Sequence, residues 1–109
     1  MATRHSSERS GERRRAFRTA LYLLRFCLMF HVYILRSIEY PRQIYMGFSS
    51  VDMRTRLDRH NAGSTPATAR YRPWELAWHC TFLDKAKAMA FEAYLKSGSG
   101  RAFLHKRLI

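Results

Sequence analysis

The sequence predicts a small α/β domain of the α+β type, in which helices flank a three-stranded antiparallel sheet. Two short runs rich in β-branched and aromatic residues, His31 to Arg36 and Gln43 to Phe48, are joined by a polar turn that contains Pro41, which is typical of a β-hairpin. A third run, Trp74 to Phe82, alternates between apolar and polar residues. Helical periodicity follows the second and third runs, and a chain of 109 residues can bury one modest core.

The first helix of this domain is predicted to follow the hairpin. At positions i, i+3, i+4 and i+7 one of its faces carries two apolar residues, a guanidinium and an imidazole: Met53, Arg56, Leu57 and His60. Ser49 or Ser50 is expected to cap this helix, with Asp52 in the first turn, where a carboxylate suits the helix dipole. Asn61 to Gly63 supplies the stop.

The segment from Gly63 to Pro73 is predicted to be a loop because of its Gly, Pro and hydroxyl content. The third strand follows it, and its alternating apolar residues are expected to share the one buried face of that strand: Leu76, Trp78, Cys80 and Phe82. His79 and Cys80 are adjacent in this strand and point to opposite faces, so they are not expected to bind one metal ion.

A second helix is predicted after the third strand. Asp84 is expected to cap it, and Leu83 to act as the hydrophobic staple. Its predicted apolar stripe consists of Ala86, Met89, Ala90, Ala93 and Tyr94. Glycines 98 and 100 are expected to end this helix, and a short closing helix from Arg101 to Leu108 is expected to turn Phe103 and Leu104 inward.

Four chemically useful side chains are expected to converge on one side of the hairpin. Tyr33 and Tyr45 lie in its two strands, and Arg56 and His60 share a face of the helix that is expected to pack against it. Read one at a time, such residues are usually buried strand aromatics, a solvated arginine and a structural histidine. Their order and spacing in the chain make the pattern more specific.

That order resembles the GIY-YIG nuclease family. Val32-Tyr33-Ile34, ten intervening residues and Tyr45-Met46-Gly47 correspond to its two motifs, and the helix with the arginine and histidine follows them. Arg72 to Leu76 and Glu92 to Arg101 resemble the small stand-alone bacterial members of the family, which are relatives of the excinuclease nuclease domain. The resemblance covers Met29 to Leu108, about three quarters of the chain.

The resemblance implies a GIY-YIG-like fold and a divalent-metal-dependent endonuclease that hydrolyses DNA phosphodiester bonds. The substrate would be selected by structure or non-specifically, in DNA repair or processing. In this scheme Tyr33 is the general base, Tyr45 positions water or phosphate, and Arg56 clamps the scissile phosphate. His60 is a second proton handler or a phosphate contact. Glu92 holds Mg²⁺ or Mn²⁺, because one carboxylate and substrate oxygens suit ions that keep most of their waters.

A missing residue and the basic character of the chain keep two other functions open. Several active members of the family carry an asparagine downstream of the residue that corresponds to Glu92, and this sequence has none there. The alternative is therefore a catalytically weak nucleic-acid-binding module of the same fold. A third hypothesis, a basic interaction protein whose arginines meet a membrane or an acidic protein, predicts no nucleic-acid affinity. Phosphate-binding glycine loops and nucleophilic Ser or Cys motifs are absent from the sequence.

The charge of the chain favours a polyanionic partner. The formal net charge is +12 and the pI is about 10.7, values that suit DNA, with RNA left open. Residues 1–28 contribute +5, from seven Arg and two Glu, and residues 29–109 contribute +7, from thirteen Lys and Arg and six acidic residues. The predicted nucleic-acid contacts are Arg54, Arg59, Arg70, Tyr71, Arg72, Lys96 and Arg101.

Residues 1–28 are predicted to be a basic N-terminal extension, flexible or partly helical, ahead of a nuclease-like domain at 29–109. The extension could be a basic arm for phosphates, an amphipathic targeting or membrane-surface segment, or an upstream extension without separate function, since Met29 resembles the start of the similar proteins. Its apolar run from Ala20 to Phe30 contains Arg25 and is too short to span a bilayer. Cys27 and Cys80 form no disulfide framework, so a reducing, cytoplasmic location is predicted.

Overall fold

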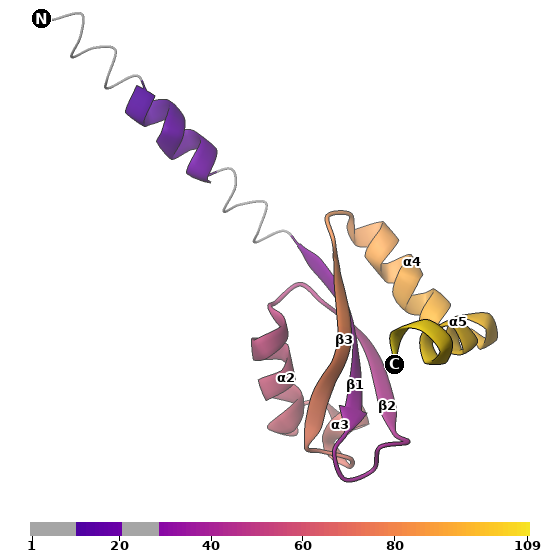
Figure 1. Ribbon diagram of the computed structural model, residues 1–109. Coiled ribbons are helices and arrows are strands. Elements are labelled where there is room, and N and C mark those ends of the chain that lie inside the picture. The colour runs from indigo at the N-terminus through magenta and orange to yellow at the C-terminus, as the bar shows by residue number, and fades with distance from the viewer. Residues whose placement is uncertain (1–10, 21–28) are drawn as a thin grey trace, which may run out of the picture.

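The computed structural model describes residues 11–20 and 29–109 of the chain. Residues 11–20 are helical, and the predictions for residues 1–10 and 21–28, including Cys27, lie outside the described residues. The remaining elements are β1 (Phe30–Ser37), β2 (Ile44–Ser49), α2 (Met53–Asn61), α3 (Pro66–Ala69), β3 (Trp74–Phe82), α4 (Lys85–Lys96), α5 (Gly98–Phe103) and a closing π-helical turn η1 (Leu104–Leu108) (Figure 1). The predicted α+β fold with a three-stranded sheet is confirmed.

The sheet has the strand order β2-β1-β3, and both pairs of neighbours are antiparallel. Helices α2 and α3 cover one face of this sheet, and α4 and α5 cover the other (Figure 1). Because successive side chains of a strand point to opposite faces, the central strand β1 supplies both layers. Val32 and Ile34 point toward α4, while Tyr33 and Leu35 point toward α2. All four are buried.

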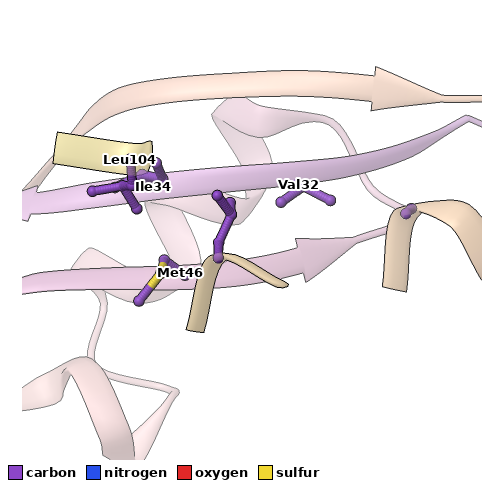
Figure 2. Packing of buried hydrophobic residues seen from close by; sticks show 6 residues of the cluster. Val32, Ile34, Met46 and Leu104 are labelled. Carbon is purple, nitrogen blue, oxygen red and sulfur yellow. The ribbon is translucent and has the colours of Figure 1, made fainter. Parts of the chain in front are cut away.

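The layer between the sheet and α4 is the main hydrophobic core, called here the α4-face core. Its buried members are Val32, Ile34, Met46, Ala88, Leu95 and Leu104 (Figure 2). Helix α4 presents Ala88, Phe91 and Leu95 to this core, at a spacing of i, i+3 and i+7. The predicted stripe through Ala86, Met89 and Tyr94 is wrong, since those residues are exposed.

The opposite layer is smaller and is called here the α2-face cluster. Tyr33, Leu35 and Trp74 are its buried members, and Leu76 packs against them. Strand β3 contributes to both layers because its register shifts: Ile34 pairs with Trp78, and Leu35 pairs with Leu76, which leaves Ala77 as an extra residue. The prediction that Leu76 shares a face with Trp78, Cys80 and Phe82 is therefore wrong, although the bounds of the strand are confirmed.

The ends of α2 are set by Asp52 and Gly63. The cap of α2 is Asp52, whose carboxylate accepts a hydrogen bond from the Thr55 backbone N–H at 2.9 Å, so the prediction of a serine cap is wrong. After the predicted stop, Gly63 adopts φ +81°, a left-handed conformation that glycine adopts without strain. The segment predicted to be one loop then contains the short helix α3.

The C-terminal elements also differ from the prediction in detail. Asp84 caps α4 as predicted, by accepting from the Lys87 backbone N–H, but Leu83 is 72% exposed and forms no staple. Ser97 ends α4 and at the same time caps α5, so the closing helix begins at Gly98 rather than at residue 101. Leu104 is buried as predicted, whereas Phe103 is exposed.

Candidate active site

The hydroxyl of Tyr33 is the meeting point of the predicted site. It accepts a hydrogen bond from Arg56 Nε at 3.0 Å and lies 2.8 Å from His60 Nε2. The arginine and the histidine both come from α2, one turn apart, so the helix presents them together to the strand. Tyr33 itself is only 1% exposed. The sequence-predicted convergence of these three residues is what the structure shows.

Gly47 makes room for the Tyr33 ring on the sheet. The two residues are cross-strand partners, and a Cβ on Gly47 would lie 2.4 Å from both the Cζ and the hydroxyl oxygen of Tyr33. Real Cβ atoms do not approach other atoms so closely, so any larger residue would push the ring aside. The glycine of the second motif therefore leaves space for the phenol ring beside β2, from which its hydroxyl reaches α2.

His60 is fully buried and packs against two tyrosine rings. Its ring centroid lies 5.7 Å from that of Tyr33 and 5.1 Å from that of Tyr45. Burial, together with the charge of Arg56, lowers the pKa of His60 to about 4. The imidazole is therefore neutral at pH 7 and shielded from solvent. Of its two predicted roles, proton handling fits this position and direct phosphate contact does not.

The pKa of the Tyr33 phenol is raised by burial, which outweighs the opposing hydrogen bond and charge of Arg56. The charges of Tyr45 and Glu92 raise it further. The nearby cation Arg56 lowers this pKa, but the effect of burial on the pKa is larger. Tyr33 is a neutral phenol at pH 7. If it acts as a base, its own hydroxyl proton must pass to another group.

Tyr45 and Arg56 form the partly exposed side of the cluster. The Tyr45 ring lies 6.3 Å from the Tyr33 ring, on the neighbouring strand. Arg56 uses Nε to contact Tyr33, and within the described residues the structure gives its two terminal nitrogens no hydrogen-bonding partner. A guanidinium in this position can donate two further bonds to an anion.

Glu92 lies on α4, apart from the four clustered residues. Its side chain is 21% exposed, and its carboxylate forms an ion pair with Lys96 Nζ at 2.7 Å. Its negative charge still raises the pKa of Tyr33, so the two groups lie within electrostatic reach of one another. The described residues contain no group of three or more Asp, Glu, His or Cys that could enclose a metal ion. A single accessible carboxylate fits Mg²⁺ or Mn²⁺, which keep several waters and take oxygens from a substrate phosphate.

The predicted nucleic-acid contacts divide between two regions. Arg54, Arg59, Arg70 and Arg72 are exposed on or after α2, and Lys96 and Arg101 are exposed on α4 and α5. Tyr71 is half-buried against the α2-face cluster. Its ring stacks under the Arg70 guanidinium at 5.3 Å and meets the edge of Tyr40 at 5.4 Å.

Thr68 is a polar residue near the site that sequence reasoning missed. It is fully buried on α3, and its Oγ1 lies 2.7 Å from His60 Nδ1. The signal that could have located this helix is Thr65-Pro66, since proline is favoured at the first position of a helix and threonine just before it. The sequence contains nothing that points from this short helix to His60.

Comparison with known proteins identifies the class. The GIY-YIG catalytic domain family matches residues 29–106, and the chain belongs to this family, which implies nuclease activity on a nucleic-acid substrate and the general use of a divalent metal. Among similar proteins are the UPF0213 proteins of Streptococcus pyogenes serotypes M3, M1 and M4. Each is 33% identical over 73 residues, covering 66% of this chain and 76% of the relative. Over residues 11–20 and 29–109, every helix is too short or too polar to cross a bilayer.

Proposed function

We propose that this chain is a divalent-metal-dependent endonuclease that hydrolyses DNA phosphodiester bonds, with Mg²⁺ or Mn²⁺ as the metal. The observation that carries the proposal is the Tyr33 hydroxyl, which is held between a cation and a neutral imidazole. The domain is too small for extended reading of base edges, so the substrate is selected by structure or non-specifically. Such an activity suits DNA repair or processing.

Tyr33 and His60 together act as the base. As the phenol oxygen accepts a proton from the attacking water, its own hydroxyl proton passes to His60 Nε2, which lies 2.8 Å from that oxygen. This transfer avoids a free phenolate, which burial of Tyr33 disfavours. The phosphate and the charge that develops on it would favour the resulting imidazolium. The role predicted for Tyr33 is kept, with His60 as the destination of its proton.

Arg56 and Tyr45 bind the phosphate. Arg56 is oriented by its Nε bond to Tyr33, so its terminal nitrogens can donate to the non-bridging oxygens where charge develops in the transition state. The Tyr45 hydroxyl positions water or a phosphate oxygen. Nearby exposed arginines on α2 and the following loop extend the positive surface along the nucleic-acid backbone.

Glu92 is the residue that would hold the metal. When bound, the metal supplies positive charge to the phosphate oxygens and to the leaving oxygen. The ion pair of Glu92 with Lys96 is a partly exposed pair between residues i and i+4, which contributes little to stability and can open without a large cost. Lys96 would then be available for a phosphate, as predicted.

The test is cleavage of labelled single-stranded, duplex, flapped and branched DNA with Mg²⁺ or Mn²⁺, beside retention of the same DNA on a gel. Glu92→Ala is compared with Glu75→Ala, which removes an exposed carboxylate from β3. We expect Glu92→Ala to abolish cleavage and keep binding, and Glu75→Ala to keep both. Equal cleavage by wild type and Glu92→Ala would contradict the metal role.

The second candidate function is a nucleic-acid-binding module of the same fold with little catalysis. The missing asparagine downstream of Glu92 and the ion pair that holds its carboxylate favour it. Binding without cleavage by wild type and both variants, in either metal, would select this function over the nuclease.

A further inference from the structure

A chain of buried hydrogen bonds continues from Tyr33 beyond His60. The Nδ1 atom of His60 lies 2.7 Å from Thr68 Oγ1, and this hydroxyl also lies 3.3 Å from the carbonyl oxygen of Thr65. His60 and Thr68 are both fully buried, so water does not compete for these groups. Each atom in the chain therefore has a defined donor or acceptor role.

Arg56 fixes the direction of the chain. Its Nε–H donates to the oxygen of buried Tyr33, so the phenol proton has His60 Nε2 as its partner and Nε2 is the acceptor. Thr68 Oγ1 then meets His60 Nδ1 as an acceptor and directs its own proton to the Thr65 carbonyl oxygen, 3.3 Å away. The proton of the neutral imidazole is then on Nδ1, and Nε2 carries a lone pair. That lone pair accepts the Tyr33 hydroxyl, whose oxygen is free to accept from Arg56 Nε.

We propose that Thr68 is a positioning residue of the active site, whose hydroxyl oxygen holds His60 in the Nδ1–H tautomer so that Nε2 can accept the Tyr33 proton. The inference rests on the proposed function for its catalytic consequence, while the tautomer itself is a property of the resting protein. With the opposite tautomer, Nε2 would carry a hydrogen and donate to Tyr33, and the phenol proton would have no acceptor there.

The position of Thr68 is itself fixed by packing. The backbone carbonyl of Thr68 accepts from the indole N–H of Trp74 at 2.8 Å, and Trp74 is only 3% exposed. The side chain of Asn61, at the end of α2, accepts from the Trp74 backbone N–H at 2.6 Å and donates to its carbonyl at 3.0 Å. These bonds tie α3 to β3 and to the helix that carries His60, as precise placement of a hydroxyl requires.

The test compares Thr68→Val, which removes the hydroxyl and keeps the shape, with Thr68→Ser, which keeps the hydroxyl. Long-range ¹H–¹⁵N spectra of the full chain at pH 7 report the tautomer, and the signals missing from His60→Gln identify His60 among the five histidines. We expect the Nδ1–H pattern in wild type and Thr68→Ser, and its loss in Thr68→Val. An Nε2–H pattern in wild type, or no change in a folded Thr68→Val, would overturn the assignment.

Cleavage rates test the consequence. We expect Thr68→Val to lower kcat roughly tenfold, the scale of one lost hydrogen bond, with KM unchanged, and Thr68→Ser to recover most of the rate. Equal kcat in the valine and serine variants would overturn the positioning role. If Thr68→Val does not fold, the wild-type and serine spectra still decide the tautomer. An inactive wild type with an Nδ1–H His60 would overturn the nuclease and still support the assignment of Thr68.

Discussion

The two faces of the sheet bury different kinds of group. On the α4 face, β1 places Val32 and Ile34 among buried apolar side chains. On the α2 face, the same strand places Tyr33 beside the buried polar residues His60 and Thr68. Within the described residues, no buried side-chain nitrogen or oxygen lacks a hydrogen-bond partner. The polar face is thus a complete network, and the apolar face is a packed core.

In this small domain, one face of the sheet mainly supplies stability, and the other carries the candidate active site. Apolar burial is non-directional, so the α4-face core can hold the sheet together without fixing any proton. Buried polar groups are favourable only when every partner is in place, so the α2 face depends on geometry. We therefore expect substitutions on the two faces to affect different measurements.

The largest effect is expected from Tyr33→Phe, which removes the hydroxyl shared by Arg56 and His60. Cleavage should fall by about 10²- to 10⁴-fold, the usual contribution of a general base. Single-turnover rates on labelled DNA measure this, with circular dichroism as the control for folding. A folded Tyr33→Phe variant within about threefold of wild type would remove Tyr33 from the proposed proton path.

The opposite face is tested by Leu95→Ala, a fully buried truncation in the α4-face core. Its free energy of unfolding should fall by about 2–5 kcal/mol, because the substitution removes apolar burial and leaves a cavity. Met89→Ala on the same helix is the matched control, since Met89 is 51% exposed, and it should change stability by less than about 0.5 kcal/mol. Urea denaturation of both variants provides the comparison, and equal losses would contradict the assigned orientation of α4.

The pH dependence of stability tests the burial of neutral His60. Its pKa is about 4 in the folded protein, below the ordinary value of 6.5, so the unfolded chain binds more protons between these values. The contribution of His60 is complete above pH 6.5 and is lost as the pH falls through 4, by on the order of 3 kcal/mol. His60→Gln should lack this component, and parallel stability curves for the two proteins from pH 7 to 4 would contradict it.

The smallest effect concerns the N-terminus of the helix that carries Arg56 and His60. Asp52→Ala should lower the free energy of unfolding by about 1 kcal/mol, because its carboxylate caps α2 through the Thr55 N–H and hydroxyl. Ser50→Ala should change stability very little, since Ser50 is exposed and Asp52 is the cap. Thermal unfolding of the two variants distinguishes them, and a larger effect from Ser50 would contradict the assigned cap.

The strands were predictable because their pattern is local. Trp74 to Phe82 is the third strand as predicted, and the two hairpin strands each differ from their predicted bounds by one residue at each end. The apolar stripe of α4 was not predictable in the same way. Nearly every face of this helix carries alanine or an aromatic residue, so its periodicity fits two stripes, and contact with the sheet selects the one through Ala88 and Leu95.

The candidate site also has one part that the sequence predicted and one part that it did not. The motif order brings Tyr33, Arg56 and His60 together because a strand and the helix packed on it determine their approach, and the structure confirms that convergence. The raised pKa of Tyr33 was not predictable, because it arises from burial between elements. The contact of Thr68 with His60 was not predictable either, because it depends on the packing of α3 against Trp74.

By itself the sequence determined the three strands, the two longer helices that follow the hairpin and β3, and the family, because periodicity and motif spacing are properties of the chain; it also predicted the candidate site residues. Only the tertiary structure decided which face of α4 is buried, where the register of β3 shifts and which nitrogen of His60 faces Tyr33. These depend on contacts between residues far apart in the chain. Burial and hydrogen-bond direction exist only once such segments have packed together.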